Sequence, residues 1–383
     1  MTLASHLPAD WRDARLLGRI QTPAGPSPVL ARGGRLYDIS AAAPTTAQAL
    51  ARDDLDRIEG VDLGALDQLS FTTVWGEKGD MVLLSPLDLQ CIKASGVTFA
   101  VSALERVIEE RARGDADAAN AVRQSILDRV GGDLKDLRPG SEQAEAVKAQ
   151  LIADGMWSQY LEVAIGPYAE IFTKAPVLAS VGWGAAVGVR ADSAWNNPEP
   201  EVVVICDPAG RPVGASLGND VNLRDIEGRS ALLLGKAKDN NASAALGPFI
   251  RLFDDGFTLD DLRQATISLE VVGDDGFIMK GESSMSLISR DPVELVGQTI
   301  GRHHQYPDGL ILYLGTMFAP IEDRDAPGGG FTHKPGDRVR VSSPRLGVLD
   351  NKVTTSDQAP PWTLGVSGLM RNLASRGLLG GAR

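Results

Sequence analysis

The chain has 383 residues, and 38 Lys and Arg against 50 Asp and Glu give it a net charge of −12. An acidic chain with no cluster of Lys and Arg lacks the cationic surface that nucleic-acid binding requires. Apolar residues make up 43% and charged residues 23%, which is ordinary globular usage and excludes a disordered chain.

The cysteines and the apolar pattern indicate a cellular compartment. The two cysteines, Cys91 and Cys206, allow neither a disulfide framework nor a thiolate zinc site. The first residues do not form a cationic stretch followed by an apolar core, and no apolar window approaches the length of a membrane span. The sequence therefore predicts a protein of the reducing cytoplasm with no membrane segment.

In chain order, short strands broken by turn signals are expected over 15–40, with the Pro- and Gly-rich residues 22–28 as a turn. A helical stretch follows near 45–58. From Ser102 onward, apolar positions recur at helical spacing, and the helical block at about 103–160 interrupts two strand-rich regions. We therefore interpret this block as an insertion.

From residue 162 onward, short β-rich runs follow one another, each bounded by Gly, Pro, Asp or Asn. This succession of short strands predicts an α+β, β-rich fold with a large rolled sheet or barrel rather than a doubly wound parallel sheet. Residues 1–90 are expected to form a smaller N-terminal α+β domain, and 91–383 the main domain. The tail near 362–381 predicts a short amphipathic helix.

Three carboxylates give the strongest indication of a functional site. Glu199 and Glu201 stand at the mouth of an apolar strand, and side chains two apart on a strand share a face. Asp220 follows an expected hairpin that could return beside them. Such a cluster is costly to bury without a cation, and oxygen ligands favour Mg²⁺, or Mn²⁺ or Ca²⁺, over zinc. The alternative is two solvated edge-strand glutamates and a turn aspartate.

Several motifs together resemble the fumarylacetoacetate hydrolase superfamily. They are the E-P-E of 199–201, GNDVNLRD at 218–225, a lysine nine residues before Gly247-Pro248, EIFTKAP at 170–176, LYLGTMF at 312–318 and PGDRVRV at 335–341. The resemblance implies a fumarylacetoacetate hydrolase-like catalytic domain. It also implies that Glu199, Glu201 and Asp220 bind a divalent metal.

One position departs from the hydrolytic members of that superfamily. The hydrolytic members carry a motif similar to G-x-N-Y-x-x-H, in which the His acts as a base on water. This chain has GVTFAVS instead, so Ser102 occupies the position of the His. A serine without an adjacent base cannot take that role at neutral pH.

The segments 187–201, 301–309 and 315–337 are instead similar to the sugar-acid dehydratases of the superfamily. That resemblance implies metal-dependent dehydration of 2-keto-3-deoxy-D-pentonate (2-dehydro-3-deoxy-D-xylonate or -arabinonate) to 2-oxoglutarate semialdehyde. The reaction belongs to non-phosphorylative pentose catabolism.

Two residues are candidates for proton transfer. Glu170 opens an apolar strand, where desolvation would raise the pKa of its carboxyl group towards working pH. The resemblance places a glutamate of the dehydratases here, beside the metal-bound substrate. Lys238 occupies the lysine position before Gly247-Pro248 and could donate a proton to the leaving hydroxyl group. The sequence leaves open which is base and which is acid, and either could be a surface side chain.

The remaining candidates concern substrate binding. Arg190 and Arg224 could each clamp a carboxylate with the guanidinium fork, although Arg224 could equally brace Asp220. Hydroxyl groups expected near the substrate belong to Thr316, Ser283 and Ser284.

The residues leave two other functions open: hydrolysis of a carbon–carbon bond in a 2,4-diketo acid, and non-catalytic binding of a sugar acid. The expected partners are a small-molecule sugar acid and further copies of the chain, as a homodimer or homotetramer.

Overall fold

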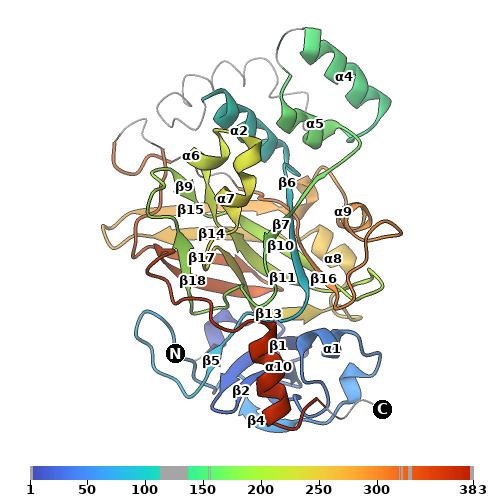
Figure 1. Cartoon of the computed structure of the whole chain (residues 1–383), viewed down its shortest axis with the longest axis vertical. Helices are drawn as coiled ribbons and strands as arrows, with labels where there is room; N and C mark the ends of the chain where they lie inside the picture. Colours follow the sequence, from blue (N-terminus) through green and yellow to red (C-terminus); the bar gives the residue numbers. More distant parts are fainter. Residues whose placement is uncertain are drawn as a thin grey trace.

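The computed structural model describes residues 3–112, 137–153, 155, 157–318, 320, 322–326 and 330–379 (Figure 1). A mixed eleven-stranded sheet dominates this part of the chain. Its strands are β1 (Leu16–Thr22), β2 (Gly25–Arg32), β3 (Arg35–Asp38), β4 (Val61–Ala65), β5 (Val82–Leu83), β6 (Cys91–Gly96), β7 (Glu170–Ala175), β10 (Pro200–Cys206), β11 (Pro212–Asp220), β13 (Ala244–Leu252) and β16 (Leu310–Tyr313). They lie in the order β4-β3-β2-β1-β13-β11-β10-β16-β6-β7, with β5 paired to β1.

A second sheet packs against the first. Its strands are β8 (Ala186–Val189), β14 (Thr266–Val272), β15 (Ile278–Ser284), β17 (Arg338–Ser343) and β18 (Gly347–Thr355), in the order β15-β14-β17-β18-β8. Burial alternates along β14 and β17, so one face of this sheet is covered. The covered side chains, such as Leu269 and Val341, share a core with Val202 of the larger sheet. A short ladder joins β9 (Asn196–Asn197) to β12 (Asn222–Leu223).

The central strand β10 is buried along its whole length. Val202 and Val204 lie in the core between the sheets, whereas Val203 and Ile205 lie in a second core on the opposite face. Burial of both faces explains why the strand after Glu201 is an unbroken apolar run rather than an alternating one.

The turn after β10 returns the chain as β11. The Asp207 carboxylate accepts hydrogen bonds from the backbone N–H groups of Ala209 and Arg211, both at 2.9 Å. Gly210 takes a φ of +81°, which a side chain would disfavour. The turn therefore fixes the register that brings the end of β11 beside the start of β10.

In the part of the chain that the structure describes, helices lie at both ends of the sheets and along one side of them (Figure 1). They are α1 (Thr46–Leu50), α2 (Ala100–Arg111), α4 (Glu142–Ala153), α5 (Gln159–Ile165), α6 (Arg224–Glu227), α7 (Leu234–Lys238), α8 (Leu259–Arg263), α9 (Pro292–Thr299) and α10 (Val366–Ser375), with 3-10 turns η1 (Ala4–His6), η2 (Leu55–Arg57), η3 (Ala231–Leu233) and η4 (Met285–Leu287). Helices α2, α6 and α7 cover one end, and α10 lies with β1 and β2 at the other. The expected helical block corresponds to α2, α4 and α5. Its stretch 113–136 lies outside the described residues.

The α+β, β-rich class is confirmed, but the expected turn over 22–28 is wrong in extent. Strand β2 already begins at Gly25 and includes Pro26 and Pro28. These prolines can join the strand because β3 pairs only with Val29–Arg32, so their missing N–H groups face no second strand. Their carbonyl groups are used, since Arg376 donates to Pro26 O and Ile39 N donates to Pro28 O.

The N-terminal strands continue the large sheet. Leu16 and Leu17 of β1 lie opposite Arg251 and Ile250 of β13, so hydrogen bonding runs across the boundary expected near residue 90. That boundary and the rolled or barrel-like closure stay predictions. The expected tail helix is present as α10. Among the described residues, no helix is both long enough and apolar enough to cross a bilayer.

Candidate active site

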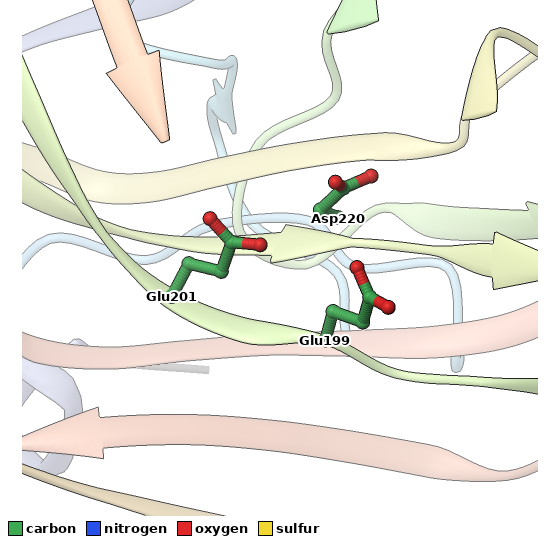
Figure 2. Close-up of side chains that lie close together, drawn as sticks. All are labelled: Glu199, Glu201 and Asp220. Carbon is green, nitrogen blue, oxygen red and sulfur yellow. The ribbon is translucent and has the colours of Figure 1, made fainter. Parts of the chain in front are cut away.

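Three carboxyl groups converge at the β10–β11 pair. Glu199 directly precedes β10, Glu201 is its second residue, and Asp220 is the last residue of β11. One oxygen from each lies within 4.8 Å of the others, and all three side chains are buried. Figure 2 shows them pointing toward one another from neighbouring segments. The strand alternation predicts this convergence for the two glutamates.

Burial and mutual repulsion dominate the electrostatics of Glu201. Removal from water, followed by the charges of Asp220 and Glu199, raises the pKa of Glu201 well above its usual value. The backbone N–H of Gly315 donates to Glu201 Oε2 at 2.7 Å and offsets only part of this effect. Glu201 therefore stays costly to ionise unless more positive charge arrives.

Two buried lysines lie against the cluster. Lys238 Nζ donates to Glu199 and to Asp220 Oδ2, the latter at 3.0 Å, and Lys174 Nζ is 2.7 Å from Asp220 Oδ1. Burial alone would raise the pKa of Asp220, but Lys174 and Lys238 hold it below its usual value. Burial likewise acts to lower the pKa of Lys238, but Asp220 and Glu199 raise it above the ordinary value. Lys238 is therefore a cation at neutral pH.

Arg106 of α2 links two acidic groups. Its Nη2 is 2.6 Å from Glu199 Oε1, and its Nη1 is 2.6 Å from Glu227 Oε2 on α6. Both glutamates are buried, and the guanidinium fork lets one arginine serve both. The arrangement fixes α2 over the carboxylate cluster.

The charges around the cluster suit a divalent cation. The acidic groups are Glu170, Glu199, Glu201, Asp220 and Glu227, whereas the cationic groups are Arg106, Lys174 and Lys238. If all of these groups were ionised, two negative charges would remain in excess. The converging donors are carboxylate oxygens, which suit Mg²⁺ better than a soft metal. The residues present therefore fit a hard dication.

Glu170 lies on the neighbouring strand, where the backbone leaves room for its carboxyl group. It begins β7 opposite Gly96 of β6. A Cβ atom at Gly96 would lie 1.9 Å from Glu170 Oε2, so a side chain there would displace the carboxyl group. Burial, followed by the charge of Glu227, raises the pKa of Glu170 to about 7. This value suits proton transfer near neutral pH.

The segment after β6 turns sharply beside Glu170. Val97 adopts a φ of +58°, a conformation that costs a β-branched residue about 1–3 kcal/mol and is found mainly where function constrains the backbone. Ser102 follows on α2, where its hydroxyl group donates to Phe99 O at 2.8 Å and accepts from Phe99 N at 3.2 Å. Ser102 thus secures the start of the helix.

The converging groups enclose a small pocket. Its lining comes from six elements and the loops beside them: Ser95, Gly96, Val97, Ser102, Arg106, Glu170, Phe172, Glu199, Asp220, Glu227, Lys238 and Thr316. Among the predicted site residues, Glu170, Lys238, Glu199, Asp220 and Thr316 meet here, and Glu201 adjoins them through the carboxylate cluster. The hydroxyl group of Thr316 donates to Phe318 O at 2.9 Å.

The other predicted residues lie elsewhere. Arg190 makes a paired contact with Asp192 at 2.6 and 2.7 Å, and Arg224 donates to Asn197 Oδ1 and Pro320 O. Ser283 and Ser284 end β15, where Ser284 accepts from Ser286 N. The pocket is not lined by any of these four side chains. The assignment of Arg190, Ser283 and Ser284 to the substrate stays a prediction without support from the pocket. The role of Arg224, as a brace for Asp220 or as a carboxylate clamp, likewise stays a prediction.

Sequence reasoning missed Arg106, Lys174 and Glu227. Arg106 lies one helical turn after Ser102, so the spacing of four residues could have placed it on the same face of α2. Lys174 is a charged residue inside an apolar strand, which is itself a sign of a buried partner. For Glu227, the sequence offers no such signal, because its role depends on where α6 packs.

The chain is similar in sequence to known proteins. The chain is 31% identical over 215 residues to a probable 2-keto-3-deoxyxylonate dehydratase of Haloferax volcanii, and the match covers 56% of this chain and 68% of that relative. The chain belongs to the fumarylacetoacetate hydrolase superfamily. A scan against protein-family models finds no match.

Two further proteins are similar to this member of the superfamily. A 2-dehydro-3-deoxy-D-arabinonate dehydratase of Saccharolobus solfataricus is 32% identical over 183 residues, covering 47% of this chain and 57% of that relative. A solved structure of 2-keto-3-deoxy-D-arabinonate dehydratase, complexed with magnesium and 2,5-dioxopentanoate, superposes with a TM-score of 0.63. It is 21% identical and covers 89% of this chain and 99% of its own. At that identity the superposition establishes the shared fold alone.

Proposed function

We propose that this protein is a divalent-cation-dependent hydro-lyase. Its substrate would be a 2-keto-3-deoxy-D-pentonate and its product 2-oxoglutarate semialdehyde, as a step of non-phosphorylative pentose catabolism. The observation that carries the proposal is the buried cluster of Glu199, Glu201 and Asp220 beside Glu170, whose pKa is raised to about 7. The dehydratase relatives support the choice of substrate.

The proposed cofactor is Mg²⁺, or Mn²⁺ or Ca²⁺, held by Glu199, Glu201 and Asp220. When bound there, it would polarise the 2-keto group of the substrate and make the protons on C3 more acidic. Gly315 N would keep Glu201 oriented by the hydrogen bond already described.

The chain supplies both proton-transfer groups. Glu170 takes one proton from C3, the bond from C4 to its hydroxyl oxygen breaks, and Lys238 donates the proton with which that hydroxyl group leaves as water. A proton shift from C5 to C3 and then from the C5 hydroxyl group to C4 gives the aldehyde, so no redox cofactor is required. The position of Lys238 supports its role as the acid, because its ammonium group lies against Glu199 and Asp220 and lines the pocket.

The direct test uses purified protein with Mg²⁺ and the D- and L-configured 2-keto-3-deoxypentonates. Formation of the semialdehyde, coupled to an aldehyde dehydrogenase, is expected for a D-configured acid and should stop when a chelator is added. Absence of semialdehyde from both acids would refute the proposed function.

Hydrolysis of a 2,4-diketo acid is less compatible with the site. Ser102 stands where hydrolytic members of the superfamily carry a His, and its hydroxyl group bonds to the backbone of Phe99. A binding protein without activity would not need Glu170 with a pKa matched to neutral pH. Cleavage products from a 2,4-diketo acid, or tight sugar-acid binding without turnover, would favour these alternatives.

The proposed assembly is a homodimer or homotetramer. Light scattering should give a mass at least twice the 40.6 kDa of the single chain at micromolar concentration. A monomer under these conditions would refute the proposed assembly and leave the reaction unaffected.

A further inference from the structure

Strand β7 places two side chains of the pocket on one face. Glu170 and Phe172 are two residues apart on this extended strand, so their side chains share a face, and both line the pocket. Phe172 also packs against the apolar core that contains Val203, which lies two residues after Glu201 on the same face of β10. Glu170 and Phe172 are therefore on the same side of the large sheet as the carboxylate cluster.

The Phe172 ring lies beside both proton-transfer groups. Its centroid is 5.7 Å from Lys238 Nζ, within the range of a cation–π contact, and Glu170 precedes it by two residues on the same face. In the proposed reaction Glu170 acts at C3 of the substrate, and Lys238 acts on the hydroxyl group at C4. The bond from C3 to C4 would therefore lie along the ring.

Phe172 is an apolar side chain in a largely polar pocket. Most residues that line the pocket have charged or hydroxyl side chains, whereas Val97 and Phe172 are apolar. A hydroxyl group held against an aromatic ring loses its hydrogen bonds to water without an equivalent replacement. In a 2-keto-3-deoxypentonate, C3 is the carbon that carries no oxygen. A wall formed by Phe172 therefore suits C3 of such an acid.

We infer that Phe172 is a specificity-determining residue that selects sugar acids without a hydroxyl group at C3. The inference rests on the proposed function, and it adds the group that distinguishes a 2-keto-3-deoxy acid from a 2-keto acid that retains its C3 hydroxyl group. An apolar pocket rejects an added hydroxyl group by up to about 100-fold, so a preference of about 10- to 100-fold is expected.

The first test uses ligands that lack a leaving group at C4 and differ by one hydroxyl group at C3. Binding of 2-oxopentanoate and of the two separate enantiomers of 3-hydroxy-2-oxopentanoate to the Mg²⁺-loaded wild-type protein is measured by calorimetry. Because Glu170 takes one of the two C3 hydrogens, the ring would face the other. We expect 2-oxopentanoate to bind about 10- to 100-fold more tightly than at least one enantiomer. Binding of both enantiomers as tightly as 2-oxopentanoate would overturn the inference.

Two variants separate the polarity of the side chain at position 172 from its volume. Phe172→Met introduces an unbranched apolar chain, and Phe172→Gln introduces a chain of comparable length that ends in an amide group. We expect Phe172→Met to keep the preference for 2-oxopentanoate over the rejected enantiomer, and Phe172→Gln to reduce it about three- to tenfold, the effect of one neutral hydrogen bond. An equal preference in the two variants would overturn the inference.

A general loss of affinity does not affect this comparison, because each preference is the ratio of two dissociation constants of the same protein. Thermal unfolding verifies that each variant is folded. If a variant does not fold, the wild-type preference still decides, since equal binding of all three ligands would contradict an apolar wall at C3.

Failure of the inference and failure of the proposed function are distinguishable. If wild type dehydrates the sugar acid but binds both hydroxylated enantiomers as tightly as 2-oxopentanoate, the inference alone is wrong. If wild type binds none of the three ligands and does not dehydrate the sugar acid, the proposed function is wrong and the inference falls with it.

Discussion

Two buried carboxyl groups on the two facing sheets have opposite surroundings. Asp350 of β18 accepts hydrogen bonds from Arg338 at 2.6 and 3.0 Å and from Arg340 at 3.0 Å, and His6 lies 3.5 Å away. Burial alone would raise the pKa of Asp350, but the His6 and Arg338 side chains hold it below the usual range.

Glu201 of β10 is as deeply buried, but its nearest charges include two further carboxylates, and its pKa is raised. The comparison shows that burial alone does not identify a functional acid. A buried carboxylate whose charge is balanced by cationic side chains of the protein stabilises the fold. A buried carboxylate that lies among further carboxylates requires a cationic ligand. The following experiments test this distinction, from the largest expected effect to the smallest.

The largest effect is expected for Glu201→Gln. Loss of one of three converging carboxylates should abolish binding of the dication and lower turnover by about three orders of magnitude, since Lewis-acid assistance contributes several kcal/mol. Turnover is measured across a Mg²⁺ titration, with Asp350→Asn as the matched control that should keep its dependence on Mg²⁺. Near-normal turnover of Glu201→Gln without added cation would contradict the assignment of Glu201 to the dication.

Glu170→Gln should lower turnover by about 10²- to 10⁴-fold, the usual contribution of a general acid or base. Proton NMR of the substrate in D₂O then assigns the role. If Glu170 is the base, both exchange of the C3 protons and dehydration are lost, whereas if it is the acid, exchange continues. The control is Glu142→Gln on the exposed side of α4, and an unchanged Glu170→Gln would remove this residue from the mechanism.

Asp350→Asn should lower the free energy of unfolding by about 3 kcal/mol, because Arg338 and Arg340 lose a buried partner. In metal-free protein, Glu201→Gln should be at least as stable as wild type, since it removes a charge that the pocket disfavours. Urea unfolding at pH 8 measures both variants. A greater loss of stability for Glu201→Gln than for Asp350→Asn would reverse the assignment of the two sites.

The smallest effect is a pH dependence from Glu170. Its pKa is about 7 when folded and 4.5 when unfolded, so its favourable contribution is complete below about pH 4.5 and is lost as pH rises through 7. Metal-free Glu170→Gln should therefore equal wild type at pH 4.5 and exceed it at pH 8 by about 2 kcal/mol, allowing for partial exposure. Thermal unfolding across this range measures the difference, and parallel curves would contradict the raised pKa.

The sequence predicts best where local pattern determines the outcome. The alternation of Glu199 and Glu201 on one strand follows from strand geometry alone, and the amphipathic tail becomes α10. The predicted turn over 22–28 is wrong in extent because the tolerance of β2 for proline depends on the short length of β3, which no local pattern encodes.

The rest of the site depends on packing between distant segments. Arg106 meets Glu199 only because α2 lies over the β10–β11 pair, and Gly96 leaves room for the Glu170 carboxyl group only because β6 pairs with β7. Ser283 and Ser284 end β15, the edge strand of the other sheet, so their expected place at the substrate stays a prediction. Composition and residue spacing do not show which segments, remote in sequence, pack against one another.

The pairing of β1 with β13 has a consequence for how the protein is made. Leu16 is synthesised long before its partner Arg251, because strands β2 to β11 lie between them in the sequence. Until then, β1 has an open edge, which could pair with another nascent chain. Contacts so remote in sequence also slow folding. Strand β1 thus depends on a later segment of the growing polypeptide, and it can take its final place only after β13 has been synthesised.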